Sequence, residues 1–337
     1  MPELRRDPIS GRWVIVAPDR ARRPLPGSGT APSRENCPFC AGHESETPDE
    51  ILALRPPGGG GPNTPGWQVR VVPNRFPALS ASGPDKRQNV GVYRTRGGVG
   101  VHEVIIESPD HHVSLTQLTP EAVEQVLSVF RERLESHRRR TDLHYALLFK
   151  NVGLEAGASI EHTHSQIMGT RILPGVIGEE WKLARREWRA RRRCLLCEMI
   201  RLDASDGRRM VVATDSFVAI CPFASRFPLE VWIVPTSHES DFDAMSENQI
   251  DSLAPVLRDV LGRVERVMGR PSYNLVLHTA PFRRRGDDSF HWHIEVMPRL
   301  GQAAGFEWGS GLFVNPLTPE DAAARLRDGD AQDTGAV

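Results

Sequence analysis

Four of the five cysteines form two pairs, Cys37/Cys40 and Cys194/Cys197, with two residues between the members of each pair. A CxxC turn presents two thiolates to one metal ion, and zinc prefers tetrahedral sets of cysteine and histidine. The alternative use is a redox pair, which belongs to a thioredoxin-like βαβ setting that this sequence lacks. The pairs therefore predict zinc sites, whereas Cys221, alone in an apolar run, is expected to be a buried small hydrophobe.

The segment from Lys150 to Gln166, KNVGLEAGASIEHTHSQ, combines residue types that handle phosphate. Gly153 and Gly157 let backbone amides approach an anion closely. Ser159 and Gln166 can donate hydrogen bonds to phosphoryl oxygens. The segment is therefore the expected site of chemistry on a phosphate ester.

A histidine in this segment, His164, is the predicted nucleophile. An imidazole with its unperturbed pKa near ~6.5 is largely neutral at pH 7 and attacks phosphorus without a base removing a proton first. A sugar phosphate is a stable leaving group and, already deprotonated, a competent nucleophile for the return step. Catalysis then reduces to positioning and charge stabilisation. The alternative is that His164 is a further metal ligand or a packed core histidine.

The metal ligands are completed by an internal repeat. HEVIIESPDHH (102–112) aligns with LEVWIVPTSHE (229–239), and HTHSQ (162–166) corresponds to HWHIE (291–295). Each half then supplies four ligands in register, which predicts two closed, structural zinc sites with no open position for substrate. The two predicted sets are Cys37, Cys40, His111 and His162, and Cys194, Cys197, His238 and His291.

The repeat also predicts the fold. Thr119 and Ser246 begin corresponding helices as N-caps, and apolar residues follow in both at helical spacing. The predicted class is α+β, with two similar halves over 1–175 and 190–327, each an antiparallel sheet with one long helix packed on it. The first half carries extra residues around 80–101. The Pro-rich segments 24–32 and 56–65 are expected to be loops, and 328–337 a frayed tail.

The second half is expected to shape the site rather than to react. It lacks the GLEAGAS stretch, and Gln166 corresponds to Glu295, whose carboxylate would repel a phosphate. His293, the counterpart of His164, is therefore predicted to be a substrate contact and not a nucleophile.

Composition excludes some partners. The chain of 337 residues has a formal net charge of −1, so no global field attracts nucleic acid or an anionic membrane. It has no apolar stretch of about 20 residues, and its N-terminus, MPELRRDPISGRW, has no apolar h-region of a secretory signal, so we expect a cytoplasmic protein. The competing class is a zinc-stabilised nucleic-acid binder, because the run 182–194 is rich in arginine. Our interpretation of that run is a solvated linker helix with Trp181 and Trp188 on its buried side.

At this point the motifs CPFC, SPDHH, HTHSQ and GFEWGSGLFVNPLTPEDAA resemble the galactose-1-phosphate uridylyltransferase family of the histidine-triad superfamily, over nearly the whole chain up to residue 327. The resemblance implies two histidine-triad-like halves and double displacement through a nucleotidyl-histidine at His164, with Ser159 and Gln166 around the phosphates. It also implies a homodimer. Further residues that the resemblance places at the substrate are Arg20 and Arg23 (phosphate or nucleotide), Asn74 and Arg75 (nucleotide), Asn151 and Gly157 (phosphates), and Phe306 and Glu307 (sugar, often from the neighbouring subunit).

The resemblance leaves the substrates open. Some family members bind the second metal with a carboxylate and histidines, and here a second CxxC pair is expected to replace that set. His-Thr-His and the second CxxC pair are closer to the branch that contains plant ADP-glucose phosphorylase. The first hypothesis is transfer of UMP from UDP-glucose to galactose 1-phosphate. The second is an adenylyl version that uses inorganic phosphate on ADP-glucose, and a dinucleoside polyphosphate phosphorylase shares the same chemistry.

Overall fold

A computed structural model describes residues 1–22, 34–269, 272–301 and 303–329. Its centre is one ten-stranded antiparallel sheet, to which each half of the chain contributes five neighbouring strands. The predicted loop 24–32 and residues 330–337 of the predicted tail lie outside the described residues. From one edge to the other, the strands are β10 (Met210–Ala213), β11 (Phe217–Ile220), β12 (Val231–Pro235), β14 (His293–Pro298), β13 (Tyr273–His278), β8 (Tyr145–Val152), β9 (His164–Thr170), β7 (Gly100–Ile106), β4 (Val69–Pro73) and β3 (Leu52–Leu54).

The two halves meet at the middle of this sheet. Strands β8 and β13 pair antiparallel, with Tyr273 opposite Val152 and Leu277 opposite Leu148. The strand order on one side of this seam repeats on the other, so the sheet consists of two similar halves joined edge to edge. This join removes two edges that would otherwise expose unpaired backbone groups.

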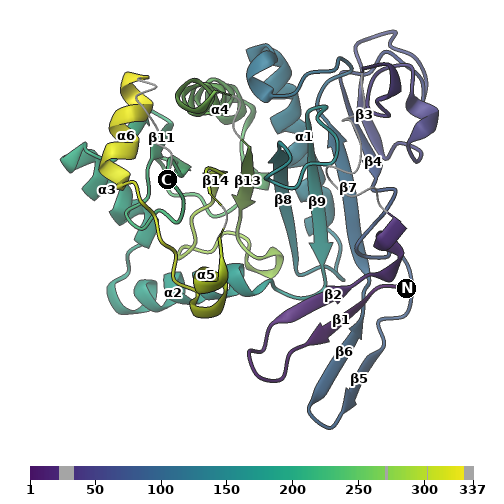
Figure 1. The fold of residues 1–337 in the computed structure, drawn as a ribbon, viewed down its shortest axis with the longest axis horizontal. Coiled ribbons are helices and arrows are strands. Elements are labelled where there is room, and N and C mark those ends of the chain that lie inside the picture. The colour runs from purple at the N-terminus through teal and green to yellow at the C-terminus, as the bar shows by residue number, and fades with distance from the viewer. Residues whose placement is uncertain (23–33, 270–271, 302, 330–337) are drawn as a thin grey trace.

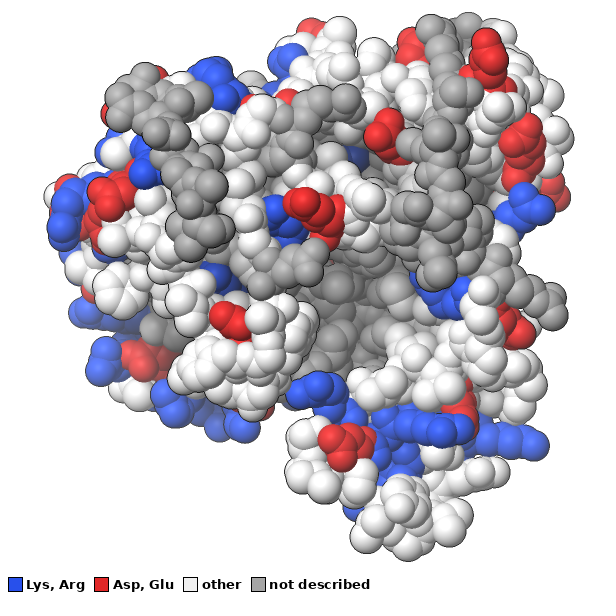
Figure 2. All heavy atoms as spheres, viewed as in Figure 1, with Lys and Arg blue, Asp and Glu red and all other residues white. Residues whose placement is uncertain are grey.

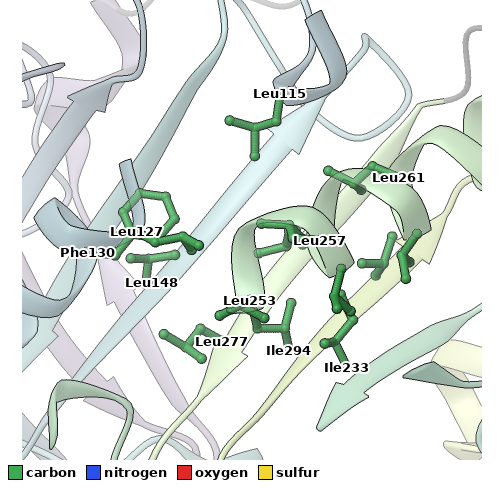
Figure 3. Packing of buried hydrophobic residues seen from close by; sticks show 14 of the residues in the cluster. Leu115, Leu127, Phe130, Leu148, Ile233, Leu253, Leu257, Leu261, Leu277 and Ile294 are labelled. Atoms are coloured by element: carbon green, nitrogen blue, oxygen red, sulfur yellow. The ribbon is translucent and has the colours of Figure 1, made fainter. Parts of the chain in front are cut away.

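Two long helices, α1 (Pro120–Arg138) and α4 (Glu247–Met268), pack side by side on one face of the sheet (Figure 1). The predicted N-caps are confirmed, because Thr119 accepts from the amide of Ala122 and Ser246 from that of Gln249. The predicted apolar helix faces are buried against the sheet (Figure 3). A shorter helix, α6 (Pro319–Asp328), packs against α4. Residue 328, the first of the predicted frayed tail, is the last residue of this helix.

Strand alternation separates the two faces of the sheet. On β9, Ile167 belongs to the apolar core under the helices, so the alternate residues His164 and Gln166 point to the opposite, open face. On β7, Ile105 belongs to the same core while Val104 and Ile106 pack in a second cluster, with Cys37 and Cys40, on the open face. The helices therefore support the sheet from behind the candidate chemistry.

The extra residues around 80–101 supply two strands of a separate four-stranded sheet, and the N-terminal residues supply the other two. Its order is β2 (Trp13–Val16), β1 (Glu3–Arg6), β6 (Tyr93–Gly97) and β5 (Arg87–Val90), and it projects from the body at the lower right of Figure 1. Lysine and arginine side chains gather over this sheet and again over helix α2, at the lower left of Figure 2.

The remaining helices connect and border the halves: α2 (Gly175–Arg191), α3 (Leu195–Asp206), α5 (Gly305–Ser310) and the 3-10 helices Pro18–Arg22, Arg34–Asn36, Glu44–Glu46, Leu115–Gln117, Phe242–Ala244 and Phe282–Arg284. In the described part of the chain, every helix is too short or too polar to span a bilayer. The indole of Trp181 donates to Asp287 at 2.8 Å and lies between Arg185 and Arg284. That ring is thus engaged within the protein, as expected for a linker helix.

Candidate active site

The first predicted metal set is assembled on the open face. The sulfur of Cys40 lies 3.4 Å from Nδ1 of His111 and 3.5 Å from Nδ1 of His162, and the sulfur of Cys37 lies 3.5 Å from the same Nδ1 of His162. All four candidate ligand atoms lie within 4.8 Å of one another. A tetrahedral ion with Zn–S near ~2.3 Å and Zn–N near ~2.0 Å separates neighbouring ligand atoms by about 3.5 Å. The donor set therefore fits zinc.

Hydrogen bonding prepares His162 to be a ligand. Its Nε2 lies 2.8 Å from the carbonyl oxygen of Ser108. Because a carbonyl only accepts, Nε2 carries the proton and the lone pair of Nδ1 faces the sulfurs. Burial lowers the pKa of His162 to about 4, which keeps the ring neutral, and burial raises the pKa of the Cys37 thiol to about 12. Two thiolates in this pocket would need a cation to balance them.

The second predicted set is also brought together. The sulfur of Cys197 lies 3.4 Å from Nδ1 of His238 and 3.4 Å from Nδ1 of His291, and the sulfur of Cys194 lies 3.8 Å from the latter. This set is more open, because Cys197 is half-buried and His238 is exposed. Among the described residues, the Nε2 atom of His291 has no hydrogen-bond partner, so this ring lacks the support that Ser108 gives to His162.

The predicted nucleophile begins strand β9 and is buried on the open face. The Nδ1 atom of His164 lies 2.7 Å from the carbonyl oxygen of His162. This carbonyl fixes the proton on Nδ1 and leaves the lone pair on Nε2. The edge of the His164 ring also packs against Phe39, with centroids 5.2 Å apart. The ring is thus held by the backbone of His162, a predicted metal ligand, and by the side chain of Phe39, which lies between the two cysteines in the sequence.

Gln166 lies on the same face two residues later. Its Oε1 is 3.0 Å from Nε2 of His102, on β7, and 3.5 Å from Nδ2 of Asn74, which follows β4. Asn74, the predicted nucleotide contact, thus lies beside Gln166. His102 was missed, although it begins the aligned segment HEVIIESPDHH. Its signal is strand register: Val104 pairs with Gln166, and His102 points to the same face two residues earlier.

A buried ion pair lies directly behind His164, on the helix side of the sheet. Lys150 Nζ donates to Glu107 at 2.6 Å, to Thr163 at 2.8 Å and to the carbonyl oxygen of His164 at 3.1 Å. The hydroxyl of Ser165 donates to the other oxygen of Glu107 at 2.6 Å. Burial lowers the pKa of Lys150, while the Glu107 carboxylate opposes that shift. Lys150 begins the predicted phosphate segment but turns away from the open face.

The predicted glycine-rich loop is a tight turn between β8 and β9. Gly153 and Gly157 have φ of +79° and +84°, which side chains disfavour, and a Cβ on Gly153 would clash with the Ser272 side chain. The amides of Gly157 and Ala158 donate within the turn, to Leu154 and Gly153. These two amides therefore shape the loop instead of facing an anion.

The second half anchors this loop to the seam. Asn274, on β13, donates to Oδ1 of Asn151 at 2.8 Å and to the carbonyl oxygen of Ala156 at 3.0 Å. Ser159 is half-buried at the end of the loop. Asn274 is a second residue that the sequence did not single out, because the pairing of β13 with β8 brings it here.

Around His293, the structure corrects one expectation. Glu180, His278 and His293 come together within 4.8 Å, so a carboxylate–histidine set exists beside the second CxxC pair and is not replaced by it. The sequence hid this set because Glu180 comes from the linker helix α2. Burial alone would lower the pKa of His293, but the carboxylates of Glu180 and Glu295 raise it. A ring that favours its cationic form is a poor nucleophile.

The other predicted substrate contacts are dispersed. Arg20 is half-buried and donates to the carbonyl oxygen of Phe76, and Arg75 is exposed and donates to the carbonyl oxygen of Glu46. Phe306 and Glu307 are on α5, which lies apart from β9 (Figure 1). One chain does not bring them to His164. Arg23 lies outside the described residues.

Comparisons with known proteins agree on the family. A model described as galactose-1-phosphate uridyl transferase, N-terminal domain, matches residues 1–174, and a domain model of unknown function matches 102–331. ADP-glucose phosphorylase of Arabidopsis thaliana is 33% identical over 97% of this chain and 93% of its own length. Galactose-1-phosphate uridylyltransferase of Thermotoga maritima is 30% identical over 97% and 98%.

A solved structure gives the same answer. The crystal structure of the Arabidopsis thaliana ADP-glucose phosphorylase with bound ADP-glucose superimposes with a TM-score of 0.76 at 31% identity, over 97% of this chain and 99% of that one. The sequence and the fold of this chain thus agree with relatives that match over nearly its whole length. The chain belongs to the galactose-1-phosphate uridyl transferase family.

Proposed function

We propose that this chain is a nucleotidyltransferase that carries a nucleoside monophosphate on His164 while moving it between a nucleotide sugar and an acceptor phosphate. The observation that carries the proposal is the tautomer of His164. Its Nδ1 is tied to the His162 carbonyl oxygen at 2.7 Å, which directs the Nε2 lone pair at a substrate. An imidazole held in one tautomer and one orientation is a preorganised nucleophile.

The reaction balances without a separate acid or base. In the first step Nε2 forms a bond to the α-phosphorus, the bond from phosphorus to the departing phosphate oxygen breaks, and a sugar 1-phosphate leaves. In the second step an oxygen of the acceptor phosphate attacks the same phosphorus, and the electron pair returns to Nε2. Gln166 and Ser159 donate to the charge that develops on the phosphoryl oxygens.

The two Cys/His sets would hold one zinc ion each. With four protein ligands the ion is closed to substrate, and what it supplies is rigidity. His162 would then be fixed by the metal through Nδ1 and by Ser108 through Nε2, and its carbonyl oxygen in turn positions His164. Four cysteine thiols used this way suit the reducing cytoplasm, which is where we place the protein.

The relatives support two versions of the substrate. The uridylyl version transfers UMP from UDP-glucose to galactose 1-phosphate, as the name of the Thermotoga maritima relative indicates for that protein. The adenylyl version uses inorganic phosphate on ADP-glucose, as the name of the Arabidopsis thaliana relative indicates for that one. A dinucleoside polyphosphate phosphorylase, with the dinucleoside polyphosphate as donor and inorganic phosphate as acceptor, shares the same chemistry.

Intact-protein mass spectrometry tests the proposal and separates the two versions. The protein is incubated with UDP-glucose or with ADP-glucose alone, without an acceptor, and weighed. A stable mass increase by one UMP or one AMP identifies the transferred nucleotide, and His164→Ala prevents it. No mass increase with either donor, together with full turnover by His164→Ala, would refute the mechanism.

We also infer a homodimer in which α5 completes the partner's sugar site. Phe306 is 58% exposed, Trp308 76% and Leu312 64%, and apolar side chains this open on a single chain mark an interaction surface. Sedimentation should give a dimer mass. Phe306→Ser combined with Trp308→Ser should weaken the dimer and raise the KM for the sugar phosphate, and a monomeric wild type would overturn the inference.

A further inference from the structure

We infer that His102 is a positioning residue that sets the orientation of the Gln166 amide, so that its NH2 group and not its oxygen faces the transferred phosphoryl group. The inference rests on the proposed function, because it names how one donor of that site is aimed. His102 is buried on the open face of β7, one strand away from the nucleophile.

The protonation of His102 follows from its partners. The backbone amide of Ala78 lies 3.1 Å from Nδ1 of His102. A backbone N–H only donates, so Nδ1 carries a lone pair and the ring proton is on Nε2. Nε2 lies 3.0 Å from Oε1 of Gln166 and therefore donates to it. The His102 ring is therefore neutral, and its Nε2–H group points at Oε1 of Gln166.

Asn74 contributes a second donor to the same atom. The backbone amide of Phe76 donates to Oδ1 of Asn74 at 2.9 Å, which turns Nδ2 toward the interior. Nδ2 lies 3.2 Å from Nε2 of His102 and 3.5 Å from Oε1 of Gln166. Two donors therefore converge on one acceptor. The backbone holds them together, since the amide of Asn74 donates to the carbonyl oxygen of His102 at 2.8 Å.

The consequence lies on the other side of the Gln166 amide. An amide rotated by half a turn exchanges a donor for an acceptor with almost no change of shape, so packing alone does not choose between them. With two donors on Oε1, only one orientation satisfies them, and the NH2 group remains to donate elsewhere. A phosphoryl oxygen in the transition state needs that donor, and an amide oxygen in its place would repel it.

The second half of the chain offers an internal comparison. Gln166 corresponds to Glu295, and at the offset of HEVIIESPDHH the residue that corresponds to His102 is Leu229. Glu295 has no amide to orient, and its carboxylate accepts instead from Arg226 at 2.6 Å. The histidine is therefore present in the half that carries the glutamine and absent from the half that does not.

Two substitutions separate orientation from simple packing. In His102→Asn the side-chain oxygen can still accept from Ala78, but no group remains near the position of Nε2. In His102→Gln the terminal amide reaches that position and restores a donor. We expect His102→Asn to lower the rate of nucleotidyl-enzyme formation by roughly 10- to 100-fold with little change in KM, part of the ~10²–10³ that one donor provides. His102→Gln should recover most of that rate. If His102 only filled space, the two variants would be impaired to a similar extent.

A double-mutant cycle with Gln166→Ala provides the second readout. If His102 acts through Gln166, adding His102→Asn to Gln166→Ala costs no further rate, and independent effects that multiply would overturn the inference. A wild-type rate for His102→Asn would also overturn it while leaving the nucleotidyl-His164 mechanism standing. Loss of the adduct in the wild type would instead remove the proposed function itself.

Zinc content and melting temperature are measured as controls to show that each variant is folded. Should His102→Asn fail to fold, Asn74→Asp supplies the test. Its carboxylate keeps the bond from Phe76 but turns an acceptor toward Gln166, which favours the reversed amide. A wild-type rate of adduct formation in folded Asn74→Asp would contradict the inference.

Discussion

At the residue scale, backbone carbonyl oxygens fix which ring nitrogen of His162 and of His164 carries the proton. Ser108 directs Nδ1 of His162 toward the cysteines, and His162 directs Nε2 of His164 toward substrate. The HxH spacing predicted that both rings share a face, and the structure places them so. His102 was beyond prediction, because its partnership with Gln166 spans 64 residues and depends on strand register that no local pattern encodes.

A substitution that copies the second half tests the donor role of Gln166. Gln166→Glu keeps the side-chain size, replaces the NH2 donor by a carboxylate and turns two donors onto a charged oxygen. We expect the rate of adduct formation to fall by about 10²–10³ or more, because a donor is lost and a like charge is added. Single-turnover kinetics measure this. Unchanged rates would show that the amide does not contact the phosphate.

At the element scale, helix faces and caps were predictable because their periods are local, while charge clusters between elements were not. Lys150 appeared to belong with the phosphate loop, yet the alternation of β8 turns it to the helix side, where it joins Glu107 from the end of β7. Its bond to the His164 carbonyl couples the two strands behind the nucleophile. The sequence does not reveal this direction, because it depends on where the strand begins.

Removing one partner of this buried ion pair should lower the free energy of unfolding more than replacing both partners. Lys150→Met leaves the Glu107 carboxylate buried without its cation, which we expect to cost about 3–5 kcal/mol of unfolding free energy. The double variant Lys150→Met with Glu107→Gln carries no charge and should lose less than the sum of the two single variants. Denaturant titrations measure all three. Purely additive losses would mean that the two side chains do not interact.

An ion pair between Glu103 on β7 and Arg133 on α1 predicts that the free energy of unfolding falls in acid. Burial alone would raise the pKa of Glu103, but the His137 ring 3.2 Å away and the hydrogen bonds from Arg133 lower it to about 2, from an ordinary 4.5. A lowered folded-state pKa stabilises the protein above pH 4.5, and that stabilisation is lost as pH falls toward 2. The shift corresponds to roughly 3 kcal/mol.

Glu103→Gln should remove that part of the pH dependence. Its unfolding free energy should be lower than that of the wild type at pH 7, and the difference should shrink below pH 4.5. Chemical denaturation at a series of pH values measures both curves, and comparing the two proteins cancels acid effects at the cysteines. Parallel curves would contradict the assignment.

At the scale of the whole molecule, the repeat predicted two halves and the ligands of both metal sets. It did not predict that β8 and β13 would fuse the sheets, because the pairing of two edges leaves no mark on the periodicity of either. The fusion explains how Asn274 of the second half reaches the loop of the first.

The two clusters should release zinc at different rates. The first set is mostly buried and His162 is supported by Ser108, whereas the second contains the half-buried Cys197 and the exposed His238. We expect two zinc ions per chain, with the second site emptied first by a chelator. A thiol-reactive dye with Cys197→Ser as the control identifies the site. Fewer than two ions in protein purified without chelator would refute the paired sites.

The most direct test of the central claim is to locate the transferred nucleotide on the chain. Protein labelled by a nucleotide sugar without acceptor is digested under conditions that preserve phosphohistidine, and its peptides are mapped by mass. The account predicts the label on Nε2 of His164, none on His293, and full release on adding a sugar 1-phosphate or inorganic phosphate. A label on any other residue, or none on the peptide that contains His164 while turnover proceeds, would contradict it.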